Sequence, residues 1–285
     1  MDTIVPEMPN AEYHALPAIS ASGLKLMKRS PAHYYARYLD PQREPDEPTP
    51  AMKMGTAWHT AIFEPHLLEA TCVQIPEGLD RRTKEGKALY AEMIEGGREP
   101  FSHSDYNRIT AMADAARVHP VSKIIFDLPG GFAEQSIFST DAETGAMCKI
   151  RPDYAVQPCE MFPYGLIVDG KSTEDASPEG FPRQAWNLDM FLQAAFYVDV
   201  YQRVMQTAKP PVFAWIAQEK TRPFPTAVYS ASDDLLEYGR RQYRPLLRKW
   251  ADCMAENTWP GYSPLVQPMA LPAWAERQVQ EGVAA

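Results

Sequence analysis

The stretch from residue 165 to residue 171, GLIVDGK, decides the fold. Its aliphatic run after a glycine predicts a β-strand. Side chains at positions i and i+2 of a strand point to the same face of the sheet. Asp169 and Lys171 should therefore project together, with Gly170 between them. An Asp and a Lys on one face are most often a plain ion pair. The residues upstream therefore show whether this pair belongs to a functional site.

Two more carboxylates precede this strand on predicted strands of their own. Asp153 lies on a strand predicted over 147–156, and Glu134 lies on one predicted over 133–139. Adjacent strands of a sheet are about 4.8 Å apart. Three consecutive strands of a meander can therefore bring Glu134, Asp153 and Asp169 side by side.

Three carboxylates on one face repel one another strongly, and a divalent cation would neutralise them. Oxygen ligands without cysteine or paired histidine favour Mg²⁺, with Mn²⁺ as a substitute. Lys171 beside such an ion could orient a water molecule and offset the charge that develops on a phosphate. Glu143 is the alternative to Glu134 if the hairpin register differs, but its place in the predicted loop over 141–145 favours Glu134.

The rest of the chain predicts an α/β (α+β) fold with a mixed central sheet flanked by helices. Residues 1–128 are expected to form a mainly helical N-terminal region, and residues 129–285 a core, within one compact domain overall. The expected helices are those beginning after Ser20, Ser30, Thr49, Ser177 and Ser232, together with 83–95 and 104–118. Further strands are expected over 212–218 and 227–230, and the proline-rich segment 259–275 is expected to be irregular.

Composition restricts the choice of function. The formal net charge of −9 argues against a protein that coats nucleic acid non-specifically, although an enzyme can confine its basic residues to one groove. Two local basic groups, 81–87 and 240–249, are more often solvated helix faces than DNA contacts. No apolar run is long enough to span a bilayer and the N-terminus has no secretion signal, so we predict a cytoplasmic protein. The four scattered cysteines predict packed thiols rather than an iron–sulfur cluster.

Several motifs resemble a known family of nucleases. Pro152-Asp153 and Asp169-Gly170-Lys171 resemble the PD-(D/E)xK nuclease signature. The five residues from Gly55 to His59 resemble the Gly-xxx-His motif of RecB-type nucleases. Gln193 and Tyr197 are similar to the Gln-xxx-Tyr motif of the same group.

Both added motifs place their two residues four apart on a predicted helix, on one face. Gly55 is expected to give room where His59 meets the sheet. The plainer alternatives are a core histidine at position 59 and ordinary packing at positions 193 and 197.

The resemblance extends to the RecE-type (exodeoxyribonuclease VIII-like) phage and prophage exonucleases over nearly the whole chain. The matching segments are Tyr13-His14, 19–24, 30–34, 55–59, 169–173, 176–180, Trp259–Tyr262 and Leu271-Pro272. The resemblance implies a bacterial or phage-encoded exonuclease that digests linear double-stranded DNA 5′→3′ and leaves 3′ single-stranded tails for recombination. It also implies a homo-tetramer and a RecT-type single-strand annealing partner.

By the same resemblance, Asp153 and Asp169 would bind metal, with help from Glu134 and His59, and Lys171 would be catalytic. Gln193 and Tyr197 would contact DNA or support the site. The alternatives are a structure-specific endonuclease and a catalytically silent DNA-binding module on the same fold. The chain shows no evident appended domain that would read DNA structure, which disfavours the endonuclease. The retained His, carboxylate and Lys residues disfavour the silent module.

Overall fold

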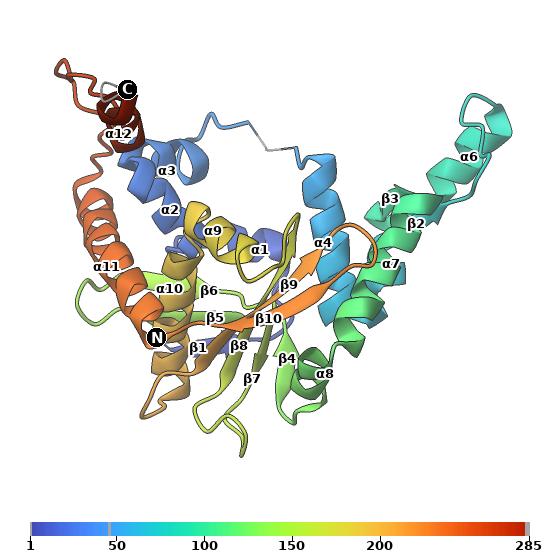
Figure 1. Ribbon diagram of the computed structural model, residues 1–285. Helices are drawn as coiled ribbons and strands as arrows, with labels where there is room; N and C mark the ends of the chain where they lie inside the picture. The colour runs from blue at the N-terminus through green and yellow to red at the C-terminus, as the bar shows by residue number, and fades with distance from the viewer. Residues whose placement is uncertain (1, 45–46, 283–285) are drawn as a thin grey trace.

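The centre of the molecule is a mixed five-stranded β-sheet (Figure 1). The computed structural model describes residues 2–44 and 47–282. In spatial order the strands are β10 (Thr226–Ser230), β9 (Val212–Glu219), β8 (Leu166–Thr173), β7 (Tyr154–Val156) and β4 (Gly131–Ala133). β8 and β9 are parallel, and the other neighbouring pairs are antiparallel. The strand predicted from GLIVDGK is therefore the middle strand of the sheet, and the predicted fold class is confirmed.

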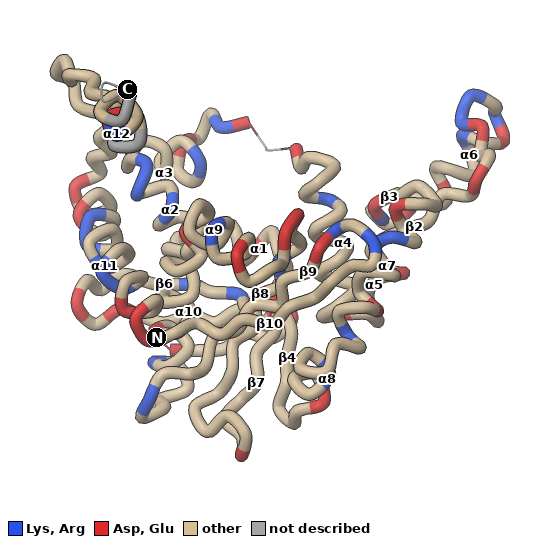
Figure 2. Tube along the Cα trace, viewed as in Figure 1, with Lys and Arg blue, Asp and Glu red and all other residues tan. Residues whose placement is uncertain are grey.

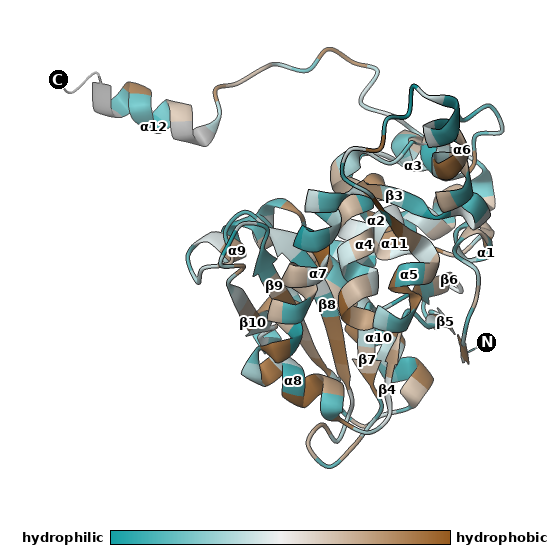
Figure 3. Ribbon diagram, turned by 90° about the vertical axis from the view of Figure 1, so that its right-hand side faces the viewer, coloured by the Kyte–Doolittle hydropathy of each residue, from teal (hydrophilic) through white to brown (hydrophobic). Residues whose placement is uncertain are grey.

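Helices cover both faces of this sheet. Ile167 and Phe213 belong to the core beneath α10 (Met190–Met205), whereas Val168 belongs to the core beneath α4 (Pro50–Phe63). β8 is thus buried on both faces, which explains its continuous aliphatic run, and Figure 3 shows β7 and β8 as hydrophobic strands between the helices.

Further helices complete the two layers. The α10 layer also contains α2 (Ala21–Arg29), α3 (Pro31–Tyr38), α9 (Gly180–Asn187) and α11 (Asp233–Glu256). The α4 layer also contains α7 (His103–Val118) and α8 (Pro120–Asp127).

A second, three-stranded antiparallel sheet lies beside the first. Its order is β1 (Thr3–Val5), β5 (Ser136–Thr140) and β6 (Met147–Ile150). The strands predicted over 133–139 and 147–156 are each broken in two, because the chain passes from one sheet to the other. Glu134 marks the first break with a left-handed φ of 51°, and Pro152, which has no backbone N–H to donate, lies in the second.

Local signals placed most helix starts correctly. The side chains of Ser20, Ser30, Thr49 and Ser232 each accept a hydrogen bond from the backbone N–H three residues later. The helix predicted to run from Ser177 to about residue 204 is instead two helices, α9 and α10. Asp189, with a left-handed φ of 51°, separates them.

The remaining elements lie at the edges of the fold. A projecting arm consists of α6 (Lys84–Met93) between two short parallel strands, β2 (Cys72–Ile75) and β3 (Glu99–Ser102), which the sequence did not predict (Figure 1). The short helices α1 (Asn10–Ala15) and α5 (Leu68–Thr71) precede α2 and β2. α12 (Ala273–Gly282) follows an irregular proline-rich segment and lies apart from the sheets (Figure 3). Among the described residues, no helix combines the length and the apolar character that a membrane crossing requires.

Candidate metal-dependent active site

Three acidic residues occupy one row across β4, β7 and β8. The neighbouring row is defined by two backbone pairings, Ala133 with Tyr154 and Tyr154 with Val168. The next row contains the three predicted acidic residues. Glu134 follows Ala133 and Asp169 follows Val168, whereas Asp153 precedes Tyr154 because β7 runs antiparallel to β4 and β8. The strand register therefore aligns these three positions, as the meander predicted.

Only one of the three carboxylates lies within a strand. Asp169 is part of β8, whereas Glu134 follows the end of β4 and Asp153 precedes the start of β7. The predicted positions inside continuous strands were wrong for these two residues. At the breaks their side chains are free of the strict alternation of a strand, and a left-handed backbone at a residue such as Glu134 persists only where its surroundings impose it.

Helix α4 brings His59 to this row from the other layer. His59 Nδ1 lies 3.5 Å from Asp153 Oδ2. The candidate ligand atoms of His59, Glu134 and Asp153 all lie within 4.8 Å of one another. His59 and Glu134 line a hollow of about 660 Å³, which gives a ligand access to the group.

The glycine that allows α4 to approach the sheet is not the predicted one. A Cβ atom added to Gly55 would meet nothing within 4 Å, so the expected steric reason for this glycine was wrong; Gly55 lines the hollow instead. A Cβ atom on Gly170 would lie 2.7 Å from the ring of Phe63 and 3.1 Å from the ring of Trp58. Gly170 therefore permits the close packing that brings His59 to Asp153.

Asp169 and Lys171 project together from β8, as the strand alternation predicted. Lys171 Nζ forms an ion pair with Asp169 Oδ2 and donates to the Gly170 carbonyl at 3.3 Å. The Asp169 side chain is 3% exposed and the Lys171 side chain is 24% exposed, so Lys171 is the more accessible of the two. Asp153 Oδ2 accepts a hydrogen bond of 2.6 Å from the Gly170 N–H, which ties the two segments together.

The charges of the site do not balance. Burial, followed by the neighbouring Asp153 carboxylate, raises the pKa of Glu134 to about 8. Burial also leaves the pKa of Asp169 above its usual range, although Lys171 opposes the shift. Burial would raise the pKa of Asp153 too, but His59 and Lys171 hold it below its usual range. The protein's own cations thus neutralise part of the acidic row, and a divalent ion would supply the missing positive charge.

The donor set fits such an ion. Two carboxylates and one imidazole, His59, Glu134 and Asp153, can each turn one ligand atom toward a common point. Asp169 is the neighbour of this group rather than part of it, because its two oxygens are engaged by Lys171 and by Gln193. The structure therefore separates the four predicted ligands into a converging group of three and one adjoining carboxylate.

The two residues of the Gln-xxx-Tyr motif lie on α10 and reach the site from the same side. Gln193 Nε2 donates to Asp169 Oδ1 at 2.8 Å. Tyr197 Oη donates to the backbone carbonyl of Arg151 at 3.4 Å, two residues before Asp153. Both side chains therefore hold the acidic segments in place.

Arg151 is a residue of the site that the sequence left without a role. Its guanidinium donates to Ser136 Oγ at 2.6 Å and to the Met8 carbonyl at 2.9 Å, and it lies over the Tyr13 ring at 4.2 Å. Arg151 lines the same hollow as His59 and Glu134. Its position directly before Pro152-Asp153 was the available signal, but only the folded chain shows that it fixes the N-terminal segment as a wall of the hollow.

The alternative acidic residue and the second basic group are engaged elsewhere. Glu143 forms an ion pair with Arg248 at the hairpin loop. Of the same basic group, Arg244 pairs with Asp141, Arg240 with Asp199 and Arg241 with Glu237. Figure 2 shows these basic residues along α11 and a further basic cluster at the tip of the α6 arm. All four α11 arginines therefore form ion pairs within the protein.

Comparison with known proteins identifies the family and the fold of the chain. A family model for a PDDEXK-like domain of unknown function (DUF3799) matches residues 20–270. The chain belongs to this family. Its fold is thus that of the PD-(D/E)xK nuclease superfamily, which the sequence motifs predicted.

One solved structure has a similar fold. A "putative exonuclease" from Eubacterium rectale aligns with a TM-score of 0.58 over 93% of this chain and 97% of its own, at 14% identity. A second structure, of SSO0001, aligns with a TM-score of only 0.29 at 10% identity over 68% of this chain and 86% of its own. No curated protein matches the sequence.

Proposed function

We propose that this protein is a divalent-metal-dependent deoxyribonuclease that hydrolyses linear double-stranded DNA from its ends. One observation carries the proposal: the candidate ligand atoms of His59, Glu134 and Asp153 lie within 4.8 Å of one another. Lys171 of β8 places its charge beside Asp169 and Asp153. A structural ion pair would not require the two further acidic residues and the histidine in the same row.

His59, Glu134 and Asp153 would hold the ion, and their oxygen-rich set without thiolates favours Mg²⁺ or Mn²⁺. When bound, such an ion lowers the pKa of a coordinated water and offsets negative charge on a phosphate. Lys171 orients the attacking water and stabilises the charge that develops on the scissile phosphate. Gln193 keeps Asp169, and through it Lys171, in the required position.

The finer details of the proposal come from the RecE-type resemblance. They are 5′→3′ polarity, 3′ single-stranded products that serve recombination, a homo-tetramer and a RecT-type annealing partner. Velocity sedimentation of the purified protein tests the tetramer, and co-purification with an annealing protein of the RecT type tests the partner.

The decisive experiment uses linear duplex DNA labelled separately at its 5′ and 3′ ends. We expect Mg²⁺-dependent release of nucleotides from the 5′ end, no cleavage in EDTA and no cleavage by Lys171→Ala. Covalently closed plasmid should remain intact. Cleavage of the closed plasmid would favour a structure-specific endonuclease instead. Binding without cleavage of either substrate in Mg²⁺ or Mn²⁺ would overturn the enzymatic proposal and leave a silent DNA-binding module.

A further inference from the structure

An exposed aromatic cluster lies on the α9–α11 side of the site. Trp186 of α9 stacks on Tyr238 of α11 with ring centroids 5.3 Å apart and an interplanar angle of 26°. Both rings contact Phe191 of α10, at 5.3 Å and 4.9 Å. Trp186 remains 58% exposed and Tyr238 37% exposed, whereas Phe191 is buried. The Trp186 ring thus packs on Tyr238 and Phe191 and still exposes much of its surface to solvent. We call Trp186 and Tyr238 the aromatic platform.

The platform is connected to the acidic row through the first turns of α10. Phe191, which supports the platform, lies two residues before Gln193, and Gln193 donates to Asp169 Oδ1 at 2.8 Å. The backbone before this turn is fixed by Asp189 in its left-handed conformation. Residues two apart on a helix point to different sides, so α10 links the platform to the acidic row along the chain only. Lys25 of α2 adds a link in space, because it contacts the Leu188 carbonyl and interacts with the charge of Lys171.

Two lysines of α2 lie near the platform, and one of them, Lys25, also lies near Lys171. Lys25 Nζ donates to the Leu188 carbonyl at 2.7 Å, and its charge interacts with those of Lys171 and Asp169. Lys28 Nζ pairs with Asp189 at 2.7 Å and lies 5.8 Å from the centroid of the Phe191 ring. Figure 2 shows basic positions on both α2 and α9 in a chain that is acidic overall.

This combination points to one kind of occupant. Exposed aromatic rings flanked by cations are how proteins hold single-stranded nucleic acid, with bases on the rings and phosphates on the cations. A base inside a duplex has both faces covered by its neighbours, so only an unpaired base or the terminal base of a duplex has a face free for the platform. Lys25 and Lys28 each use an N–H donor within the protein, at the Leu188 carbonyl and at Asp189, and because an ammonium group has three donors both can also contact a phosphate.

We propose that Trp186, supported by Tyr238, stacks an unpaired nucleobase of the DNA strand whose phosphate enters the row of Glu134, Asp153 and Asp169. The inference rests on the proposed function and adds to it a single-strand binding site next to the cleavage site. The enzyme would accordingly act on a strand that has left the duplex before its phosphate reaches Lys171.

The test measures binding apart from cleavage. In the Lys171→Ala background with Mg²⁺, fluorescence anisotropy compares a labelled oligo(dT) of about eight nucleotides with an abasic strand of the same length. Trp186→Ala should weaken oligo(dT) binding by about 5-fold to about 150-fold, the range for one base–aromatic stack, and leave abasic binding nearly unchanged. Trp186→Phe, which keeps a ring, should recover most of the affinity. Tyr262→Ala is the matched control, because Tyr262 is 73% exposed on the C-terminal segment.

The outcomes separate this inference from the proposed function. Equal affinity of Trp186→Ala and its parent for oligo(dT) overturns the platform even if the wild-type protein cleaves DNA. A base-dependent loss of binding supports the platform even if the wild-type protein cleaves nothing. A change of oligomeric state in Trp186→Ala, measured by sedimentation, without a base-dependent loss would show that the rings contact a second copy of the chain and would overturn the inference.

Discussion

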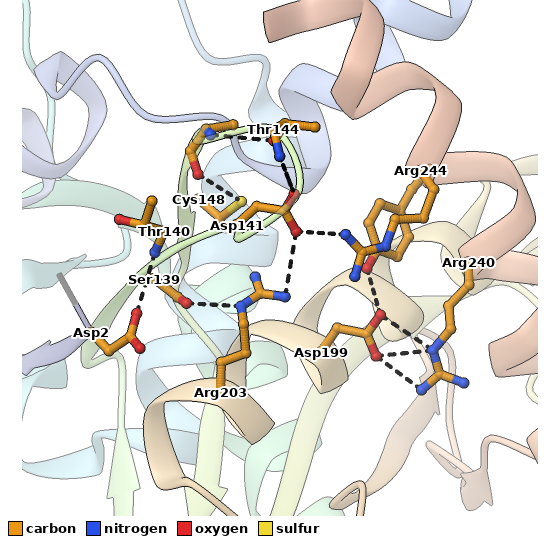
Figure 4. Close-up of polar contacts among 12 residues, drawn as sticks. Asp2, Ser139, Thr140, Asp141, Thr144, Cys148, Asp199, Arg203, Arg240 and Arg244 are labelled. Carbon is orange, nitrogen blue, oxygen red and sulfur yellow. Dashed lines mark hydrogen bonds and ion pairs between the residues drawn. The ribbon is translucent and has the colours of Figure 1, made fainter.

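Two groups of buried carboxylates lie toward opposite ends of α10, and they are neutralised in different ways. Toward the C-terminal end, Asp141 pairs with Arg244 at 2.5 Å and with Arg203 at 3.8 Å. Asp199 pairs there with Arg240 at 2.9 Å and accepts a hydrogen bond from Tyr243 (Figure 4). In this first group, which we call the arginine network, each carboxylate has an arginine of its own.

The acidic row near the N-terminal end of α10 is arranged otherwise. Lys171 and His59 together serve the three carboxylates of the row, Arg151 adds its charge near Glu134, and burial still raises the pKa of Glu134 to about 8. In the arginine network, burial would raise the pKa of Asp141, but Thr144 and Arg244 hold it below its usual range. Burial is common to both groups, so the difference is the supply of positive charge. The arginine network neutralises itself, whereas the proposed metal site is left short of cations.

The largest expected effect is on catalysis. Lys171→Ala should reduce the rate of DNA cleavage by at least about 10²–10³-fold, the usual cost of removing one group that stabilises charge in the transition state. Initial rates on end-labelled linear duplex measure it. Lys220→Ala is the control, because Lys220 pairs with the exposed Glu174 away from the row. Retained cleavage by Lys171→Ala would show that the lysine only neutralises Asp169.

Metal affinity gives the second comparison of the two groups. Asp153→Asn keeps an acceptor for the Gly170 N–H but removes one anionic ligand, so Mn²⁺ affinity should fall by about 10–100-fold or more. Isothermal titration calorimetry measures the affinity. Asp199→Asn is the matched variant from the arginine network and should bind Mn²⁺ as the wild type does. Equal losses in the two variants would contradict the distinction between a metal site and a structural cluster.

Stability gives the third comparison, and here the arginine network should be the more sensitive. Arg244→Ala leaves the buried Asp141 with Arg203 alone and should lower the free energy of unfolding by about 2–3 kcal/mol. The melting temperature should fall by roughly 5–10 °C, with or without Mg²⁺. Arg241→Ala removes an exposed pair with Glu237, worth roughly 0–1 kcal/mol, and should leave the melting temperature nearly unchanged. A loss that Mg²⁺ restores would place Asp141 in the metal site instead.

The smallest expected effect is a change in the pH dependence of stability without metal. Because the pKa of Glu134 is about 8 in the folded protein and near 4.5 when the chain is unfolded, the folded state binds the extra proton between these values. The free energy of unfolding should therefore fall as pH rises from about 4.5 to about 8. Glu134→Gln removes this contribution.

The difference in melting temperature between Glu134→Gln and wild type, measured in EDTA, should accordingly grow between pH 5 and pH 8. Added Mg²⁺ should close the gap at pH 8, because the ion replaces the proton on the wild-type carboxylate. Parallel melting profiles across this pH range would mean that Glu134 is ionised in the metal-free site.

The sequence by itself determined the features that depend on neighbours along the chain. The caps at Ser20, Ser30, Thr49 and Ser232 are local hydrogen bonds, and the aliphatic run before Asp169 specified a strand buried on two faces. The i, i+2 alternation placed Asp169 and Lys171 on one side of that strand, and the order of the motifs identified the nuclease fold.

Only the tertiary structure decided where distant residues meet and how the charges balance. The breaks at Glu134 and before Asp153 arise because each strand changes sheets, which no local pattern specifies. The close approach of α4 depends on Gly170, whose significance appears only when Phe63 and Trp58 lie against it. Whether a buried carboxylate is paired with an arginine or lacks a neutralising cation depends on side chains far apart in sequence. Electrostatic interactions are set by distance in space and by burial.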